Sequence, residues 1–513
     1  MPQYAAVDIG SNSVRLLVAD AAPHEPLPQI TRVVEERQVT RLGESVFRDG
    51  SISDEAMQEV AGVLAQMRQT WQKYDVVGAR AVATSATRDA SNQAEFIKRA
   101  SEAIGIRVET ISGQEEARLI QLGALAVWPH PKQRILIVDV GGGSAELIHA
   151  ESGRLVSAFS RPLGAVRLQT AFLKDDPPTE TQLHRLRSFI DEKLSVTVPK
   201  LGDRRYDRVI ATSSSAAAVV SAVNRLPRAK RDMADRLRAR TSEVRKLYKD
   251  LVGRDLNGRR KMPGIGPRRA EIIIPGTAVF LAVLETFQLP SLYYCAAGVR
   301  QGIAADLARR RVGRELSRLS PEERKVVEAL ARRYGVEIRH ARKLADFANS
   351  LFVALEPLHR LTPNHGKFLE AACYLLDTGH YISDTSHHKH SYYIINNSDL
   401  PGFTDSERAL VGMLCRYHRK ALPSPRHSDY ISLPAETKKT LALMIPMLRL
   451  ADGLDRTRDQ RVESVSCELR AGSVNLLLRS NMKTDLEQWA VEQVAEPFRQ
   501  VYDRTLSVSV QRG

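Results

Sequence analysis

Cysteine is scarce in this chain of 513 residues: there are four, and no two of them form a Cys-x-x-Cys pair. We therefore expect neither a disulfide framework nor a zinc ribbon, and a reducing, cytoplasmic location fits this composition. Long apolar runs are missing as well. The longest, residues 272–287, is broken by Pro275, Gly276 and Glu285 and is shorter than the ~20 residues that a membrane-spanning helix needs. No basic and apolar leader precedes the first predicted strand, so the sequence predicts neither secretion nor a membrane partner.

Aromatic residues make up only 6% of the chain and are almost absent from its most basic stretch. Residues 225–269 hold 16 Lys or Arg against 5 Asp or Glu, a large part of the formal net charge of +15. Such a block predicts a polyanionic partner. Because single-stranded nucleic acid is bound largely by stacking on aromatic rings, we expect no nucleic acid here but an anion without bases, such as inorganic polyphosphate. A solvated helix face with a flexible loop is the alternative explanation.

The stretch at 135–148 carries the clearest chemical signal. An apolar run brings a carboxylate to the end of a predicted buried strand, and three glycines follow it. Glycines let the backbone turn tightly with its N–H groups exposed, which suits phosphate, and a neighbouring carboxylate can hold Mg²⁺. The residues concerned are Asp139, Gly141, Gly142, Gly143, Ser144 and Glu146.

The same pattern occurs 131 residues earlier, where residues 6–18 align on 137–149 without a gap. The identical pairs are Val7/Val138, Asp8/Asp139, Gly10/Gly141, Ser13/Ser144 and Leu16/Leu147. A repeat of this length is a duplicated domain, because solenoid units repeat every ~20–50 residues. We therefore expect two related lobes facing each other across a cleft with phosphate between them. The first turn would contribute Gly10, Ser11, Asn12 and Ser13, and neither turn continues as a Walker A loop.

A general base is expected at the start of a helix near residue 113. Ser112 precedes Glu115 by three residues, so a capping box accounts for Glu115. Glu116 is then free to point into the cleft towards Asp139 and to act as a base. Upstream, a predicted strand is followed by several hydroxyl residues and Arg88. Arg88 either contacts phosphate or belongs to an ordinary capped turn.

These motifs together resemble the family of exopolyphosphatases and guanosine pentaphosphate phosphohydrolases, the Ppx/GppA phosphatases. The resemblance rests on residues 7–13, 111–120, 138–146, 163–168, 299–302 and 379–420. It implies an α/β fold with two actin-like lobes (ASKHA, ribonuclease H-like) around a cleft, and Glu116 as the catalytic base. It also implies that Asp139 and Glu146 serve the metal, Mg²⁺ or Mn²⁺, and the attacking water. Asp8, a further metal ligand, and the two turns would hold the phosphates.

Two departures from the family's pattern stand out. Residues 211–215 read Ala-Thr-Ser-Ser-Ser, where the family has glycines around a small-residue turn. Side chains there oppose a close backbone approach and disfavour a nucleotide or phosphate contact. The family's Arg-Glu-Gly also appears as Arg300-Gln301-Gly302, which removes a charge.

The C-terminal part changes character at about Gly313, with helical patterns and eight of the 13 histidines between residues 359 and 427. It resembles an HD-type metal phosphohydrolase domain, but Leu376 stands where the histidine of the metal-binding His-Asp pair is expected. We therefore predict a degenerate HD-like domain without a second working hydrolase site. The domains are predicted at 1–126 (lobe I), 127–308 (lobe II), 309–460 (helical HD-like domain) and 461–513 (small α+β region).

A track for a long anion is predicted along two segments, a Gly- and Pro-rich basic loop and the histidine cluster. Its residues would be Arg259, Arg260, Lys261, Arg268, Arg269, His387, His388 and His390. A homodimer would lengthen the track by joining two subunits, so we expect one.

The predicted function is that of an exopolyphosphatase, a phosphoric anhydride hydrolase acting on the terminal phosphate of inorganic polyphosphate. Conversion of pppGpp to ppGpp is the alternative, because both reactions remove a terminal phosphate. A kinase or a chaperone-like ATPase of the same fold is less favoured, because Glu116 suits attack by water and the altered turn at 211–215 disfavours adenosine.

Overall fold

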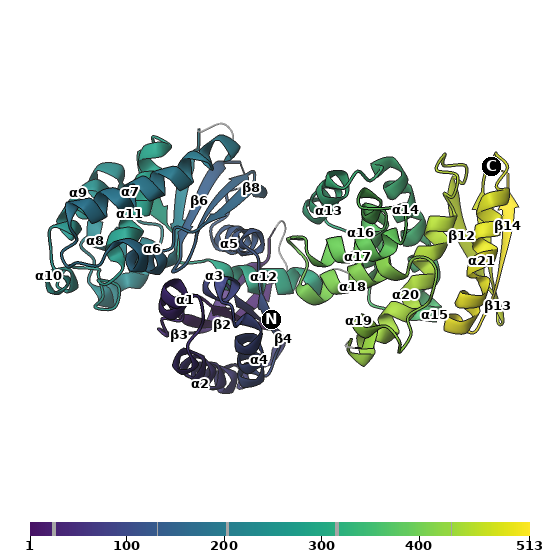
Figure 1. Ribbon diagram of the computed structural model, residues 1–513, viewed down its shortest axis with the longest axis horizontal. Helices are drawn as coiled ribbons and strands as arrows, with labels where there is room; N and C mark the ends of the chain where they lie inside the picture. Colours follow the sequence, from purple (N-terminus) through teal and green to yellow (C-terminus); the bar gives the residue numbers. More distant parts are fainter. Residues whose placement is uncertain (23–26, 131, 202–204, 313–317, 432, 513) are drawn as a thin grey trace. The chain divides into compact units, whose positions relative to one another are not determined.

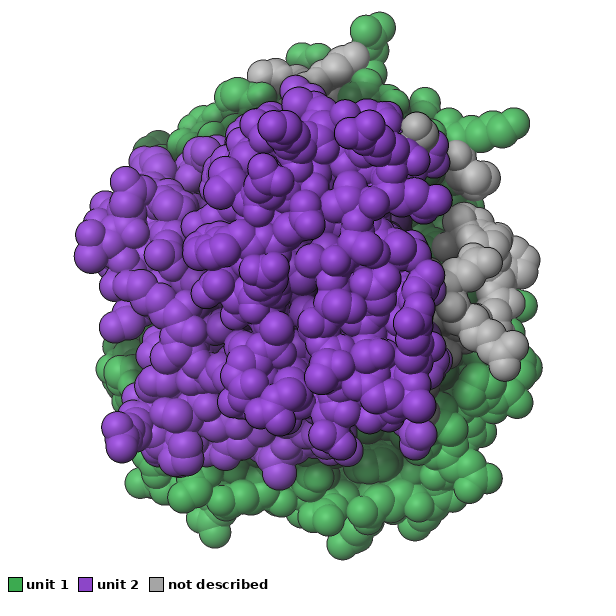
Figure 2. Space-filling model, turned by 90° about the vertical axis from the view of Figure 1, so that its right-hand side faces the viewer, with its two compact units in different colours: residues 1–312 green, residues 313–513 purple. Residues whose placement is uncertain are grey.

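The computed structural model describes the chain apart from residues 23–26, 131, 202–204, 313–317, 432 and 513 (Figure 1). The chain divides into two compact units, residues 1–312 and 313–513 (Figure 2). The predicted change of character at Gly313 lies outside the described residues, and the predicted boundary between 308 and 309 falls within helix α12 (Val299–Val312). Within the described part of the chain, no helix is both long and apolar enough to cross a bilayer.

The first unit is built on two sheets, and each contains one copy of the repeated motif. Their strand orders are β3-β2-β1-β4-β5 and β10-β11-β9-β6-β7-β8. The strands of the first sheet are β1 (Gln3–Ile9), β2 (Val14–Ala22), β3 (Gln29–Gln38), β4 (Val76–Ala83) and β5 (Val108–Thr110). Those of the second are β6 (Arg134–Val140), β7 (Ala145–Glu151), β8 (Arg154–Arg161), β9 (Arg208–Thr212), β10 (Arg238–Arg240) and β11 (Ser291–Tyr294). The α/β class and the two related lobes are therefore confirmed.

Helices pack on both sheets (Figure 1). The first five are α1 (Gly43–Asp49), α2 (Asp54–Trp71), α3 (Ser85–Asp89), α4 (Gln93–Ile104) and α5 (Gly113–Val127). Before α12 come α6 (Ala165–Phe172), α7 (Glu180–Ser195), η1 (Val198–Leu201), α8 (Ser213–Val223), η2 (Arg228–Ala234), α9 (Thr241–Val252), α10 (Leu256–Arg260) and α11 (Ile273–Thr286). Helix α11 is buried on nearly all sides because its sequence is almost wholly apolar.

The two copies of the motif fold into matching hairpins. Strands β1 and β2 are antiparallel, and so are β6 and β7. At the first turn the Gly10 amide donates to the Ser13 carbonyl at 3.1 Å, and at the second the Gly141 amide donates to the Ser144 carbonyl at 3.0 Å. Equal residues at equal positions thus make equal turns, as a duplication predicts.

Helix α5 is buried on two opposite faces. Leu119 packs in a cluster with residues of the first sheet and α12, whereas Ile120 and Ala124 pack against Ile137 of the second sheet. A helix that touches core on both sides needs apolar residues around most of its circumference, and the sequence of α5 supplies them. Its first turn, which carries Glu116, is therefore fixed relative to both sheets.

Two glycines bring α5 and α12 into backbone contact. A Cβ on Gly302 would overlap the carbonyl group of Leu119, and a Cβ on Gly123 would overlap the carbonyl oxygen of Gly298. Neither neighbour is the mobile end of a side chain, so neither can give way. Glycine is required at this contact for its lack of a side chain.

The second unit begins with helices and ends with a small sheet. The helices are α13 (Pro321–Arg333), α14 (Ile338–Ala354), α15 (Glu356–His359), α16 (Asn364–Leu375), η3 (Thr378–Tyr381), α17 (His387–Asn396), α18 (Asp405–Tyr417), α19 (Ser428–Ile431), α20 (Ala435–Gly453) and α21 (Asp485–Tyr502). The sheet, in the order β12-β13-β14, consists of β12 (Ser464–Leu469), β13 (Ser473–Arg479) and β14 (Thr505–Gln511). Leu376 lies in the core of this unit.

We expect Gly302→Ala to destabilise the first unit by about 1–3 kcal/mol, because the added methyl group forces α12 away from α5. Thermal and urea unfolding of the full chain measure this change. The matched control is Gly62→Ala in α2, an exposed helical glycine with open space at the Cβ position, which should be stabilising by about 0.5–1 kcal/mol. Equal effects of the two substitutions would contradict the backbone contact.

Candidate active site

A cavity of about 420 Å³ lies where the two hairpin turns meet. The predicted site residues that line it are Asp8, Gly10, Ser11, Asn12, Ser13, Glu116, Asp139, Gly141, Gly142, Gly143 and Ser144. Two predicted residues, Arg88 and Glu146, are not part of the lining. The fold thus brings together side chains from both copies of the repeat and from α5.

The two turns touch each other across this cavity. A Cβ on Gly142 would lie 2.9 Å from the Cβ of Ser11, and one on Gly143 would lie 2.8 Å from the Ser11 hydroxyl oxygen. That hydroxyl accepts a hydrogen bond from the Ala86 amide at 3.2 Å. The glycines of the second turn therefore make room for the first turn, in addition to exposing their own amides.

Glu116 lies in the first turn of α5, where the sequence predicts a base. The Arg88 guanidinium donates to its Oε2 at 2.8 Å and to the Ile111 carbonyl at 2.8 Å. Burial raises the pKa of Glu116 above its usual value, Arg88 opposes the rise, and the charges of Asp8 and Asp139 add to it. Arg88 is thus engaged with Glu116 through Nη1, and its contact with phosphate stays a prediction.

Three more carboxylates share the electrostatic environment of Glu116. Burial raises the pKa of Asp8, against the charges of Arg15 and Arg300, and it also raises the pKa of Asp139, which accepts a hydrogen bond from the Thr212 hydroxyl. Glu146 has its pKa raised well above the usual value by burial and by Glu116 and Asp139.

The buried carboxylates have the ligand chemistry of a divalent-cation site, although among the described residues they do not bring three ligand atoms within 4.8 Å of one another. Glu146 is fully buried; its Oε1 accepts from the Ser160 hydroxyl at 2.8 Å, and its Oε2 has no hydrogen-bond partner among the described residues. Like charges held together in a buried place need a counter-charge. Carboxylate oxygens are the ligands preferred by Mg²⁺ and Mn²⁺, so Asp8 and Asp139, which line the cavity, are suited to such an ion.

Glu115 has a different role from the capping box expected of it. The Ser112 hydroxyl does accept from the Glu115 amide at 3.2 Å, but the Glu115 carboxylate pairs with Arg118 and Arg80 instead of returning to Ser112. Arg80 and Arg118 also pair with Asp306 of α12. This buried network joins α5 to α12 beside the catalytic candidate.

Two arginines of the site were missed by the sequence reasoning. Arg15 lines the cavity and donates to the hydroxyls of Ser13 at 3.2 Å and Ser214 at 3.1 Å. Arg300 donates to the Leu16 carbonyl and pairs with Glu35 at 2.6 Å. Arg15 had a signal: it lies two residues after Ser13 on a strand and therefore on the same face. Arg300 lies in the stretch 299–302 that carries the resemblance, but its place beside Leu16 and Glu35 depends on contacts far apart in the chain.

The turn at 211–215 has a serine in a backbone conformation that favours glycine. Ser213 has a φ of 87°, a conformation that favours glycine, and its hydroxyl accepts from the amides of Ser215 and Ala216. The side chain thus caps α8 while the backbone keeps a glycine-like shape. Ser213, Ser214 and Ser215 line the cavity.

The predicted anion track is only partly exposed. Arg269 lines the cavity and donates to the Ser215 hydroxyl at 3.2 Å, and Lys261, Arg260 and Arg268 are exposed. Arg259 is buried and pairs with Asp176 at 2.5 Å, so it cannot meet a passing anion.

The histidine part of the track is also only partly accessible, and it lies in the second unit. His387 and His388 are buried, which places them out of reach of a polymer on the surface, and His390 is half-buried. We therefore leave Arg259, His387 and His388 out of the track.

Comparison with known proteins supports the resemblance. The pattern of the Ppx/GppA phosphatase family matches residues 17–311, and that of its domain III matches residues 323–493. The crystal structure of an exopolyphosphatase-like protein is 27% identical, with a TM-score of 0.57 over 61% of this chain and 99% of that one. The Ppx/GppA family member of Aquifex aeolicus is 26% identical, with a TM-score of 0.52 over 61% and 99%. An exopolyphosphatase from Cytophaga hutchinsonii, 23% identical with a TM-score of 0.55 over 60% and 98%, is similar in fold.

We expect Glu146→Gln to stabilise the metal-free protein by at least about 1 kcal/mol at pH 8. A raised pKa in the folded state means that ionised Glu146 opposes folding, so the gain grows as pH rises above 4.5 and vanishes near that value. Urea unfolding between pH 5 and pH 8 in the presence of a chelator measures it. The control is Glu151→Gln, at the exposed end of the same strand. A variant less stable than wild type at pH 8 would refute the cluster's electrostatics.

Proposed function

The chain belongs to the Ppx/GppA phosphatase family, and from this premise we propose that it is an exopolyphosphatase. The reaction would be hydrolysis of the terminal phosphate of inorganic polyphosphate by in-line attack of water, with Glu116 as the general base. The observation that carries the proposal is the position of Glu116. Its buried carboxylate, with a raised pKa, lines the same cavity as both glycine turns.

Glu116 has the properties of a base for water. A carboxylate is a better proton acceptor when its pKa is closer to the working pH, and burial moves the pKa of Glu116 in that direction. Arg88 holds one carboxylate oxygen, Oε2, at 2.8 Å and leaves the other to accept a proton from water. Because the base lies on a helix fixed between two sheets, the orientation of the water follows from the fold.

The phosphate would be held by amides and cations from both copies of the repeat. In the transition state of phosphoryl transfer, charge spreads over three equatorial oxygens. Residues of both turns and Arg15 line the cavity, and the amides that the hairpins leave unbonded and the Arg15 guanidinium would suit this charge. Metal dependence is general in this family, and Mg²⁺ or Mn²⁺ held by Asp8 and Asp139 would offset the charge on the phosphate oxygens.

A linear polymer fits the distribution of charge better than pppGpp does. Arg269, at the end of the basic block, reaches the cavity, and Lys261 and Arg268 of the same block are exposed. A chain of phosphates can extend along such cations, whereas a guanosine offers them no added charge. A homodimer and a cytoplasmic location remain expectations from the sequence.

We expect Glu116→Gln to release phosphate from long-chain polyphosphate about 10²–10⁴-fold more slowly, because the amide cannot accept a proton from water. Phosphate release with Mg²⁺, measured side by side on polyphosphate and pppGpp, provides the test. Glu55→Gln is the matched control, an exposed glutamate in the first turn of α2. Near-normal turnover by Glu116→Gln would refute the role of this residue as the base. Faster hydrolysis of pppGpp than of polyphosphate by the wild type would make pppGpp the substrate.

We expect the double variant Lys261→Ala/Arg268→Ala to raise KM for long polyphosphate several-fold and to leave kcat unchanged, because these cations attract the polymer outside the cavity. Hydrolysis of pppGpp should be unaffected. The difference in KM for polyphosphate between the variant and the wild type should shrink at high salt. Lys98→Ala, an exposed lysine on α4, is the control. An equal loss of activity on both substrates would show that the basic block does not recognise the polymer.

A further inference from the structure

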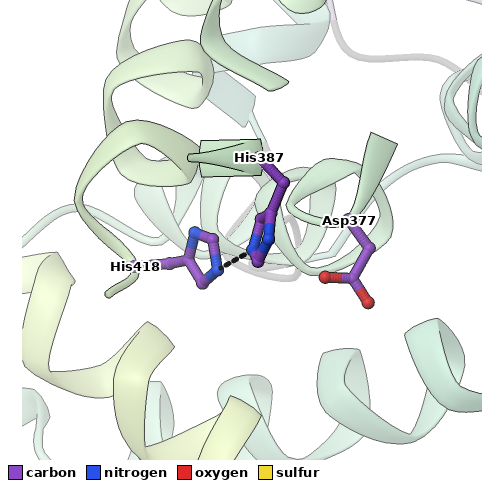
Figure 3. A group of neighbouring side chains, drawn as sticks. All are labelled: Asp377, His387 and His418. Atoms are coloured by element: carbon purple, nitrogen blue, oxygen red, sulfur yellow. Dashed lines mark hydrogen bonds between the residues drawn. The ribbon is translucent and has the colours of Figure 1, made fainter. Parts of the chain in front are cut away.

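Three side chains of the second unit converge on one point that lies outside the proposed active site. They are Asp377, His387 and His418, each with one ligand atom within 4.8 Å of the others (Figure 3). The Nε2 atoms of the two imidazoles face each other at 3.2 Å. Both histidines are buried, and the Asp377 side chain is nearly so.

The backbone brings these side chains together. Asp377 immediately precedes η3, His387 is the first residue of α17, and His418 follows the last residue of α18. A Cβ on Gly379 would overlap the carbonyl oxygen of His387, so η3 and α17 approach as closely as their backbones permit. The Ser391 hydroxyl accepts from the Gly379 amide at 2.9 Å and donates to the Leu376 carbonyl at 2.6 Å, which fixes the segment before Asp377.

His418 is oriented as a ligand. Its Nδ1 lies 2.7 Å from the Cys415 carbonyl oxygen, and because a carbonyl only accepts, this nitrogen carries the proton. In the neutral ring Nε2 is therefore unprotonated, and its lone pair points at His387. A backbone carbonyl in this position is the usual outer partner of a metal-bound histidine.

The distance between the two imidazole nitrogens suits one shared ion. Two imidazole nitrogens at 2.0–2.1 Å from a tetrahedral ion lie about 3.3 Å apart, close to the 3.2 Å between the Nε2 atoms. Two imidazoles and one carboxylate form a ligand set typical of zinc. We propose that Asp377, His387 and His418 bind one divalent transition-metal ion of the zinc class, with water in the fourth position. Leu376, which removes the ligand of an HD-type pair, takes no part in this set.

An exposed arginine competes with the ion. Arg419 Nη1 lies 3.2 Å from His387 Nδ1 and 3.4 Å from His387 Nε2. Because an arginine only donates and is always charged, its guanidinium opposes a cation at this imidazole. Binding of the ion would therefore move the Arg419 side chain towards solvent. Asp377 keeps its bond from Arg458 to Oδ2 at 2.5 Å and offers Oδ1, which lies 3.5 Å from His380 Nε2.

The test uses the full chain without a histidine tag, freed of metal by a chelator and titrated with Co²⁺ and then Zn²⁺. We expect one equivalent of Co²⁺ to give the intense visible bands of a four-coordinate ion, and Zn²⁺ to displace it. The oxygen-only cluster of the first unit would hold Co²⁺ in six-coordinate form with weak bands, so the two sites are distinguished. The result is therefore independent of the role of Glu116.

Variants give changes of opposite sign. His387→Gln and His418→Gln should each weaken Co²⁺ binding by at least about tenfold, whereas Arg419→Gln should strengthen it by about fivefold because it removes a competing charge. His390→Gln, on the same helix as His387, should bind as wild type does. Unchanged binding in the double variant His387→Gln/His418→Gln would overturn the proposal.

A loss of folding in the histidine variants would be visible by circular dichroism. In that case Asp377→Asn and X-ray absorption of the wild-type protein loaded with one equivalent of Zn²⁺ decide. We expect two imidazoles in the first coordination shell and weaker binding by Asp377→Asn. A shell without imidazole would overturn the site.

Discussion

Burial of four carboxylates in one place is the constraint on which the first unit depends. Burial is the largest cause of the raised pKa of Asp8, Asp139, Glu116 and Glu146, and the charges of Asp8, Asp139 and Glu116 add to the rise in their neighbours. Isolated charges of this kind would neutralise themselves by taking up protons. The surrounding cations and hydroxyl donors, and a divalent ion where one is bound, keep the carboxylates available for chemistry. Keeping these carboxylates buried and ionised therefore costs free energy, and the binding of substrate can relieve part of this cost.

The rest of the fold keeps this arrangement from relaxing. Helix α5 cannot shift towards either sheet, since both of its faces are packed, and it cannot withdraw from α12 without breaking the ion pairs of Arg80 and Arg118 with Asp306. Removing one partner of such a buried network leaves uncompensated charge, which costs about 3–5 kcal/mol. Stability here rests on the same helix that positions the base, so the two properties are coupled.

Local sequence signals predicted those features that depend on neighbouring residues in the chain. The duplication located both hairpins because equal side chains impose equal turns, and Glu116 followed from its place at a helix start. The reciprocal half of the capping box at Glu115 was wrong, because its carboxylate pairs with Arg118 on the same helix and with Arg80 of β4 instead. Arg300 and the Asp377, His387 and His418 cluster join residues far apart in sequence with no recurring spacing. Burial of Arg259 and His387 likewise depends on tertiary packing, which the pattern of charges in the sequence does not predict.

The contact between the two hairpin turns has a consequence for how this chain can change over generations. Ser11 occupies the room that a side chain on Gly142 or Gly143 would need, so the two turns are complementary in size although their sequences are similar. A mutation that enlarges one turn is tolerated only if the other turn shrinks. The two turns are therefore not interchangeable, and a change in the size of either one requires a compensating change in the other.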